Sequence, residues 1–290
     1  MTAVDTARLV ALGAIWGASF AFVRASVEAF GPIVLIELRL SLAAALLAVV
    51  AVWTRRTLKR ANWRHHALVG TLNSAVPFLL FAHAALVLPA SLLSLFNALA
   101  PLMGALVARV WLKTALAPHT LLGLALGFAG VAALGYEGAT TASLDHGLAA
   151  TLLALGAALL APFLYGIAAT YIKWRAANVT PFENAHGAMW AAALVVLPLA
   201  ILSPHAFAPA PGDWAAAAAL GFVCTGAAYL LNFRLIADLG PTRALTVTYL
   251  IPLFGTLWGT AFLGETLGLG FALGAPLVLA GTWLAQSAKA

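Results

Sequence analysis

The sequence predicts an all-α membrane protein with ten transmembrane helices, arranged as two inverted five-helix repeats. Only 8% of its 290 residues are charged and 63% are hydrophobic, whereas soluble domains carry roughly 25% charged residues. A soluble globule of this size could not bury so many apolar side chains, so lipid must be the solvent. Two further observations, a one-sided distribution of basic residues and an internal repeat, set the number and orientation of the helices.

Each expected span is an apolar run of about 20 residues, the length of helix that crosses a hydrocarbon core about 30 Å thick. Prolines, glycines and a basic run at 55–60 separate the spans. The segment 136–146 is expected to be a loop, and the short gap at Pro89 is alternatively a kink within one long hairpin. The expected spans are 7–27, 32–53, 65–86, 90–112, 119–136, 147–172, 182–202, 214–236, 241–263 and 269–287.

The basic residues determine the orientation expected for these spans. Of the 15 lysines and arginines, all but Arg24 and Arg39 fall on the side of the N-terminus when the chain crosses ten times. Because such residues favour cytoplasmic loops, we expect both termini in the cytoplasm. The formal net charge of +6 does not predict nucleic-acid binding, since the basic residues lie in short gaps between apolar runs.

Residues of the first half recur at a nearly constant spacing in the second half. Trp16 aligns with Tyr165 at an offset of 149 residues, and pairs farther along align at an offset of 151. Since five is an odd number of crossings, the second copy enters the membrane from the opposite side. We therefore expect inverted repeats at 1–138 and 139–290 in one integrated domain, with substrate bound between them near the midplane. Chance alignment of common residues is the alternative. The other pairs are Gly17–Gly166, Arg24–Lys173, Pro32–Pro181, Gly70–Gly221, Phe78–Tyr229, Pro101–Pro252, Gly104–Gly255, Gly123–Gly274 and Gly130–Gly281.

The chain resembles the EamA family of the drug/metabolite transporter superfamily over most of its length. The resemblance rests on WGASF at 16–20, YLIP at 249–252 and LGET at 263–266. It implies ten helices, a central cavity and export or exchange of small metabolites. Within the family the chain is most similar to bacterial exporters of aromatic amino acids, which implies a location in a bacterial inner membrane. The first half has LKT at 112–114 where the second has LGE, so the acidic ending occurs once and a functional role for Glu265 is not implied.

Aromatic and polar side chains at mid-membrane depth are the candidate binding residues, because unsatisfied polar groups in lipid are costly. Trp16 and Tyr165 lie away from the interfaces where such rings usually collect. Ordinary helix packing is the alternative for each aromatic residue. The predicted substrate-binding residues are Trp16, Phe78, His83, Asn97, Tyr165, Tyr229, Asn232 and Tyr249, with Phe81, Thr248 and Trp258 as neighbouring candidates. Pro101 and Pro252 are predicted to remove helix hydrogen bonds at matched depths, which would kink both helices or expose carbonyl groups to the cavity, and to take part in gating.

Ionisable residues within the spans are few. His83 either binds a carboxylate or carries a proton, or is a neutral imidazole bonded to a neighbouring helix carbonyl. Glu37 and Arg39 are expected at the outer edge of the second span, with side chains reaching toward water. Two residues apart, they do not face each other on a helix, so their partners should come from other helices. No carboxylate is expected near the middle of a span, which favours facilitated diffusion or exchange, although His83 is a substitute proton carrier.

No cofactor or metal is expected. Cys224 is the only cysteine, which excludes a disulfide or a thiolate zinc site within the chain. The glycines lie in apolar runs with no following Lys-Ser or Lys-Thr, so no phosphate-binding loop and no ATP coupling are predicted. GxxxG spacings such as Gly13 with Gly17 are interpreted chiefly as contacts within the bundle, with dimerisation as the alternative.

The leading hypothesis is a secondary transporter, whether exporter, exchanger or facilitator, that moves small metabolites by alternating access. Amino acids, aromatic ones included, are the leading substrate class. The alternatives are a drug or toxic-cation efflux transporter, a nucleotide-sugar carrier, an integral-membrane enzyme and a non-transporting scaffold. Scarce central carboxylates count against cations, and the lack of central basic residues counts against nucleotide sugars. The expected partners are a small-molecule substrate and the lipid bilayer. The oligomeric state stays open, and a monomer is compatible with the sequence.

Overall fold

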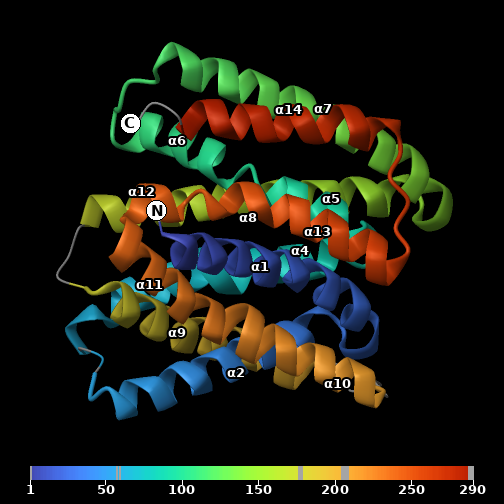
Figure 1. The fold of residues 1–290 in the computed structure, drawn as a ribbon. Coiled ribbons are helices and arrows are strands. Elements are labelled where there is room, and N and C mark those ends of the chain that lie inside the picture. The colour runs from blue at the N-terminus through green and yellow to red at the C-terminus, as the bar shows by residue number, and fades with distance from the viewer. Residues whose placement is uncertain (1, 57, 59, 176–178, 204–208, 287–290) are drawn as a thin grey trace.

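The computed structural model describes residues 2–56, 58, 60–175, 179–203 and 209–286, and in these ranges the chain is helical apart from turns and short connections. The helices form one bundle, with α7 and α14 side by side at one edge and α2, α9 and α10 at the other (Figure 1). The helices of the first half are α1 Ala3–Phe30, α2 Pro32–Trp53, η1 Arg60–Asn62, α3 Trp63–Gly70, η2 Thr71–Ala75, α4 Val76–Ala84, α5 Ala90–Asn97, α6 Ala100–Trp111 and α7 Pro118–His146. Those of the second half are α8 Leu148–Arg175, α9 Pro181–Leu202, α10 Pro211–Ala218, η3 Ala219–Ala227, α11 Ala228–Leu239, α12 Pro241–Ala244, α13 Val247–Leu263 and α14 Leu269–Gln286.

Each expected span coincides with one helix or with a run of adjoining helices. Among the described residues, seven helices or continuous helical runs are long and apolar enough to cross a membrane. Three shorter apolar helices are Pro118–Leu134, Val247–Leu263 and Leu269–Ala285. The predicted all-α, multi-span fold is thus confirmed, while the count of ten spans stays a prediction. Three parts of these predictions fall on residues outside the described ranges. They are residues 57 and 59 of the basic run, residues 204–208 of the gap before 214, and residue 287 at the end of the last expected span.

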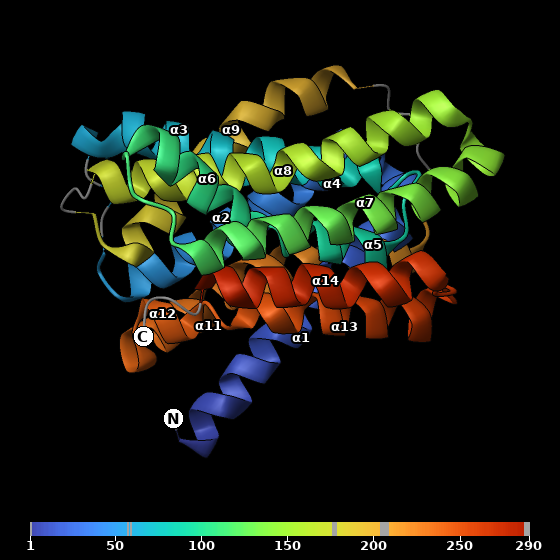
Figure 2. The same ribbon diagram turned by 90° about the horizontal axis from the view of Figure 1, so that it is seen from above.

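The exterior of the bundle is apolar, as expected of a protein solvated by lipid. Leu153, Leu202 and Phe262 expose 75%, 81% and 74% of their surface. Large apolar patches of this kind are rare on soluble monomers. The start of α1 and the end of α14 lie at the same end of the bundle (Figures 1 and 2). We call this the N-terminal end and the other the far end.

Glycine and proline end the helices where the sequence predicts. Gly31 and Gly240 adopt φ values of 71° and 80°, which suit a residue without a side chain. Each is followed by a proline that opens the next helix, where its missing N–H costs no hydrogen bond. The gap at Pro89 is a true break, because α4 ends at Ala84 and Pro89 precedes the first residue of α5. The alternative of one kinked hairpin is therefore wrong.

Two expectations about local structure need correction. The segment 136–146 is not a loop, because α7 continues to His146 and stops only at Gly147, whose φ is 81°. No proline follows the first residue of this helix, so nothing ends it earlier. Pro101 does not kink a helix: it lies in the first turn of α6, after a break that follows Asn97. Pro252 does lie inside α13, and its predicted gating role is untested.

The third and eighth expected spans each contain a π-helical segment, η2 and η3. Such segments insert extra backbone into a helix and occur frequently at functional sites. The two overlap when η2 is shifted by 151 residues, so the irregularity follows the offset of the sequence repeat. Sequence reasoning predicted uninterrupted helices here.

Glycines allow close contact between helices of the two halves. An added Cβ at Gly17 of α1 would lie 2.7 Å from the nitrogen of Gly255 in α13. An added Cβ at Gly166 of α8 would lie 2.8 Å from the nitrogen of Gly104 in α6. Gly17 corresponds to Gly166 in the repeat, and Gly104 corresponds to Gly255. The two contacts therefore join equivalent positions, with the two halves exchanged. The glycine spacings therefore serve contacts within the bundle, as predicted.

Candidate functional site

A cavity of about 420 Å³ lies in the middle of the bundle. This volume is in the range of sites for small molecules. The cavity lies between both halves of the chain, and its walls are mostly apolar or aromatic. It is lined by Trp16, Ser19, Phe20, Val23, Arg39, Asn73, Phe78, Phe81, Leu93, Asn97, Ala100, Tyr165, Cys224, Thr225, Tyr229, Asn232, Ile236, Ala244, Leu245, Val247, Thr248 and Ile251.

Six of the eight residues predicted from the sequence line this cavity. They come from α1, α4, α5, α8 and α11 and are Trp16, Phe78, Asn97, Tyr165, Tyr229 and Asn232. The neighbouring candidates Phe81 and Thr248 line it too. Their position is thus as expected, while their role in binding is a prediction.

The other predicted residues point elsewhere. His83 is exposed on α4 and is absent from the cavity wall. It follows Phe78 by five residues, which is about 140° around the helix. The hydroxyl of Tyr249 donates to the carbonyl oxygen of Thr282 in α14 at 3.3 Å. Trp258 donates its indole N–H to the carbonyl oxygen of Ala14 at 3.0 Å. These contacts bond Tyr249 and Trp258 to neighbouring helices, and neither residue lines the cavity.

Arg39 is a cavity residue that sequence reasoning placed wrongly. It was expected at the water edge, yet its side chain is buried and lines the cavity. Its Nε donates to Oγ1 of Thr225 at 2.9 Å, and its guanidinium carbon lies 3.7 Å from the ring centroid of Phe78. Thr225 lies in the second half, so the partner does come from another helix. The expected lack of central basic residues counted against a nucleotide-sugar carrier. That premise is wrong, because Arg39 lies two helical turns into α2.

Glu37 behaves differently from Arg39. It is also buried, but it does not line the cavity. Its Oε1 accepts from the hydroxyl of Ser41 on the same helix at 2.6 Å, and its Oε2 is buried without a partner among the described residues. The expectation that its partner would come from another helix is wrong. The two side chains of the expected edge pair are independent of each other, as their spacing predicted.

The π-helical segment η3 positions the partner of Arg39. The hydroxyl of Thr225 donates to the carbonyl oxygen of Leu220, five residues earlier, at 2.9 Å. It also accepts from Arg39, so both hydrogen-bonding roles of the hydroxyl are in use. The neighbouring Cys224 and, from η2, Asn73 line the cavity as well. The sequence pattern gave no indication of these residues, because a π-helical turn changes which side chains face inward.

Aromatic rings pack along one wall of the cavity. Phe20 and Phe81 meet edge to face with centroids 5.5 Å apart, and Phe81 lies 6.4 Å from Tyr165. Tyr229 stacks on Phe233 at 6.0 Å. Such contacts hold the rings in place and leave a preformed apolar surface.

Most of the lining follows the spacing of the internal repeat. Fourteen lining residues form seven pairs at the offsets of 149 or 151. Each half therefore contributes corresponding positions to one chamber. The pairs are Trp16–Tyr165, Asn73–Cys224, Phe78–Tyr229, Phe81–Asn232, Leu93–Ala244, Asn97–Thr248 and Ala100–Ile251.

The two ends of the cavity differ. At the N-terminal end the lining reaches Leu245, which is 51% exposed. At the far end, Glu265 after α13 accepts from the backbone N–H groups of Ala90 and Ser91 at 2.6 and 3.0 Å. The lining thus includes an exposed side chain at the N-terminal end, while the two halves are bonded together at the far end.

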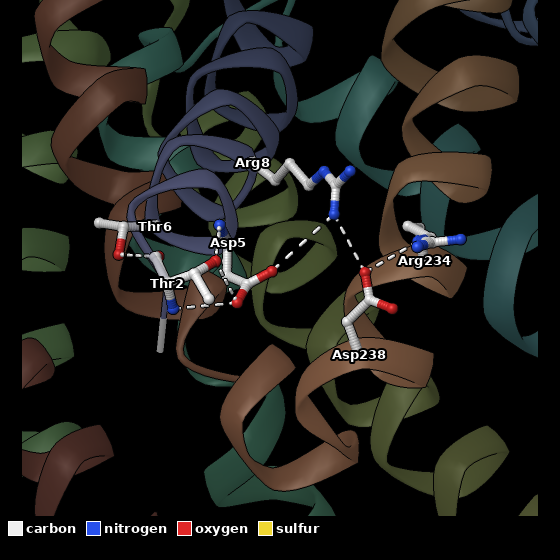
Figure 3. A network of polar contacts seen from close by, with 6 residues as sticks. All are labelled: Thr2, Asp5, Thr6, Arg8, Arg234 and Asp238. Carbon is white, nitrogen blue, oxygen red and sulfur yellow. Dashed lines mark hydrogen bonds and ion pairs between the residues drawn. The ribbon is translucent and has the colours of Figure 1, made fainter.

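An exposed network ties α1 to α11 at the N-terminal end (Figure 3). Arg8 lies 3.0 Å from the carboxylate of Asp238 and 3.8 Å from that of Asp5, and Arg234 donates to Asp238 at 2.8 Å. The hydroxyl and N–H of Thr2 donate to Asp5 and lower the pKa of its carboxyl. Exposed pairs of this kind contribute little to stability.

A second cavity of about 460 Å³ adjoins the first and shares Asn73, Tyr229, Asn232 and Ile236 with it. It extends toward His65, whose Nε2 lies 2.7 Å from Oδ1 of Asn184. Among the described residues, no group of three or more His, Cys, Asp or Glu is placed to hold a metal ion. The second cavity is therefore a side chamber of the first, with polar side chains in its wall.

Comparisons with known proteins agree with this architecture. The chain is 27% identical over 279 residues to a protein of Streptantibioticus cattleyicolor named as a probable terminal-alkyne amino-acid exporter, covering 93% of this chain and 89% of that protein. A solved crystal structure superimposes with a TM-score of 0.66 at 20% identity, covering 98% of this chain and 97% of that one. The EamA-like transporter family matches residues 7–136 and again residues 152–286. The protein is therefore a multi-pass membrane protein that belongs to the EamA-like transporter family.

Proposed function

We propose that this protein is a secondary transporter of amino acids, aromatic ones included. The observation that carries the proposal is the central chamber, walled by corresponding positions of both halves and lined with aromatic rings and amides. Such walls suit a small molecule with an apolar part and a polar end. The relative named as a probable amino-acid exporter supports the same substrate class.

We further infer ten membrane spans in two inverted repeats, divided near residues 138 and 139. The family matches each half separately, which supports the repeat. The contacts of Gly17 with Gly255 and of Gly166 with Gly104 support the two-fold relation between the halves. The one-sided basic residues support cytoplasmic termini. The similarity to an exporter of Streptantibioticus cattleyicolor supports a bacterial inner-membrane location.

Transport is proposed to proceed by alternating access. The exposed lining residue Leu245 supports an opening at the N-terminal end, and the basic residues support a cytoplasmic location of that end. Movement of one half against the other would close this end and open the far end. No step in this cycle calls for a cofactor.

A drug or cation exporter is the second candidate within the family. The lining residues include Arg39 and no Asp or Glu, a charge balance that disfavours a cationic substrate. A nucleotide sugar also fits poorly, because a single arginine does not balance two phosphate charges. Neutral or zwitterionic molecules suit this lining better.

Counterflow in proteoliposomes tests the proposed function. Vesicles loaded with unlabelled phenylalanine should accumulate labelled phenylalanine when they contain the protein and not when they lack it. A screen over the other amino acids, with and without a pH gradient, then separates facilitated exchange from proton coupling. If no amino acid moves under any of these conditions, the proposed substrate class is wrong.

A further inference from the structure

We propose that Arg39, held in place by Thr225, is the receptor for a carboxylate, so that the transported molecule carries one carboxylate into the cavity. The inference rests on the proposed function and names the chemical group that the site selects. It follows from the burial of Arg39, from its partners and from the charge of the lining.

Arg39 is a buried cation that no carboxylate of the described residues neutralises. It is 8% exposed, and among the described residues no carboxylate lies within ion-pair distance of it. A charged side chain inside a membrane protein is costly and usually has a paired or functional role. The cavity that Arg39 lines is the space in which a counter-ion can lie.

The neighbours of Arg39 fix the guanidinium and leave donors free. Thr225 takes the Nε–H, and the ring of Phe78 covers one face at 3.7 Å. A guanidinium has five N–H donors, so four are unused by the hydrogen bonds of the described residues. Two parallel N–H groups held in one plane match the two oxygens of a carboxylate.

The rest of the lining suits the remainder of such a molecule. Apart from Arg39 the lining residues are uncharged. The amide oxygens of Asn73, Asn97 and Asn232 can accept from an ammonium group, and the ring of Trp16 can attract it. The aromatic wall accepts an apolar side chain. A zwitterion with one carboxylate fits this arrangement, and a cation without a carboxylate does not.

Three ligands with the same phenyl group separate the contributions of the carboxylate and of the ammonium group to binding. Phenylalanine carries both charges, 3-phenylpropionate only the carboxylate, and phenylalaninamide only the ammonium. Binding is measured on purified protein from the shift in thermal unfolding, and transport from counterflow. The wild type should bind phenylalanine and phenylpropionate about tenfold or more tightly than phenylalaninamide, since the hydrogen bonds involve charged groups.

Substitution of Arg39 should remove this preference. R39Q should weaken binding of phenylalanine roughly 10-fold to 100-fold and leave phenylalaninamide unchanged or tighter. R39K should retain part of the preference, because lysine keeps the positive charge but lacks the two parallel N–H groups of the guanidinium. The matched control is R24Q, since Arg24 is partly exposed and pairs with Glu28 at 2.7 Å outside the cavity. It should behave as the wild type.

The outcomes distinguish failure of the inference from failure of the proposed function. Transport or binding of phenylalaninamide as good as that of phenylalanine leaves a transporter in place and overturns the carboxylate receptor. An unchanged preference in R39Q overturns it as well. If no ligand of the three binds or moves, the proposed function fails too. If R39Q does not fold, T225V gives the test, with an expected loss for phenylalanine of about threefold to tenfold and none for the amide.

Discussion

The two ends of the cavity correspond in the sequence repeat but differ in chemistry. At the far end the carboxylate of Glu265 accepts from the N–H groups of Ala90 and Ser91, at the start of α5. Pro89, the N-cap residue there, provides no side-chain cap. Glu265 thus satisfies orphan helix donors and lies at the positive end of a helix dipole. A residue of one half thereby bonds the first turn of a helix in the other half.

The corresponding positions at the N-terminal end lack the carboxylate and one of the two N–H donors. An offset of 151 pairs Glu265 with Thr114 and Ala90 with Pro241. Threonine lacks a carboxylate, and proline lacks the N–H. Ser94 at the far end is fully buried, whereas its counterpart Leu245 is 51% exposed. The comparison teaches that the two ends of a repeated architecture can differ in bonding and in exposure through the chemistry of a few positions.

The largest effect is expected from removal of the acid. E265A leaves two backbone donors without their charged partner, and each such bond contributes about 1.5–3 kcal/mol. Maleimide labelling of a cysteine at Ser94, in a C224A background in detergent, should accelerate about tenfold or more. T114A, at the counterpart position, should leave the rate unchanged. Equal effects of the two substitutions would contradict the asymmetry.

A smaller effect is expected from building the missing bond at the N-terminal end. T114E combined with P241A supplies a carboxylate and an N–H at the positions that correspond to Glu265 and Ala90. The added bond should favour closure, so labelling of a cysteine at Leu245 should slow about threefold to tenfold. T114E alone keeps the proline and should slow labelling less. Faster labelling in the double variant than in T114E would count against the comparison.

A third prediction concerns the room that Glu265 needs. A Cβ added at Gly259 would collide with the Glu265 carboxylate, and the corresponding residue in the first half is Ala108. G259A should therefore disturb the far end, with labelling at Ser94 about threefold faster, because the flexible carboxylate can partly adjust. A108G is the control and should change only helix stability, by about 1 kcal/mol in thermal unfolding. No change in G259A would mean that the carboxylate has other space.

The smallest effect is expected from the exposed network at the N-terminal end. D238N removes the carboxylate shared by Arg8 and Arg234. Exposed ion pairs contribute about 0–1 kcal/mol, so the thermal unfolding temperature and labelling at Leu245 should change little. A shift as large as that of E265A would show that the N-terminal end is held by charge after all.

The sequence was sufficient for the class of fold and for much of the cavity wall. Apolar runs, prolines and the repeat located the helices and the pairs Trp16–Tyr165 and Phe78–Tyr229. Arg39 was misplaced because its position in the span is compatible with two environments. A charged side chain there can reach toward water or point into a cavity. Its only sequence signal was its departure from the one-sided pattern of basic residues.

Other parts of the site depend on geometry that periodicity does not encode. A π-helical turn brings Thr225 to Arg39, and the pattern of apolar residues has no feature that marks such a turn. His83 and Tyr249 were expected in the cavity from depth alone. Depth does not specify the angle around the helix axis, and the structure places both outside the cavity lining.

The most direct test of the account measures access to the cavity from both ends in one protein. Single cysteines at Leu245 and at Ser94, each in the C224A background, are labelled with and without phenylalanine, after C224A alone is shown to support counterflow. Alternating access predicts that substrate changes the two rates in opposite directions. Rates that both rise when phenylalanine binds would contradict a cavity that opens to one end at a time.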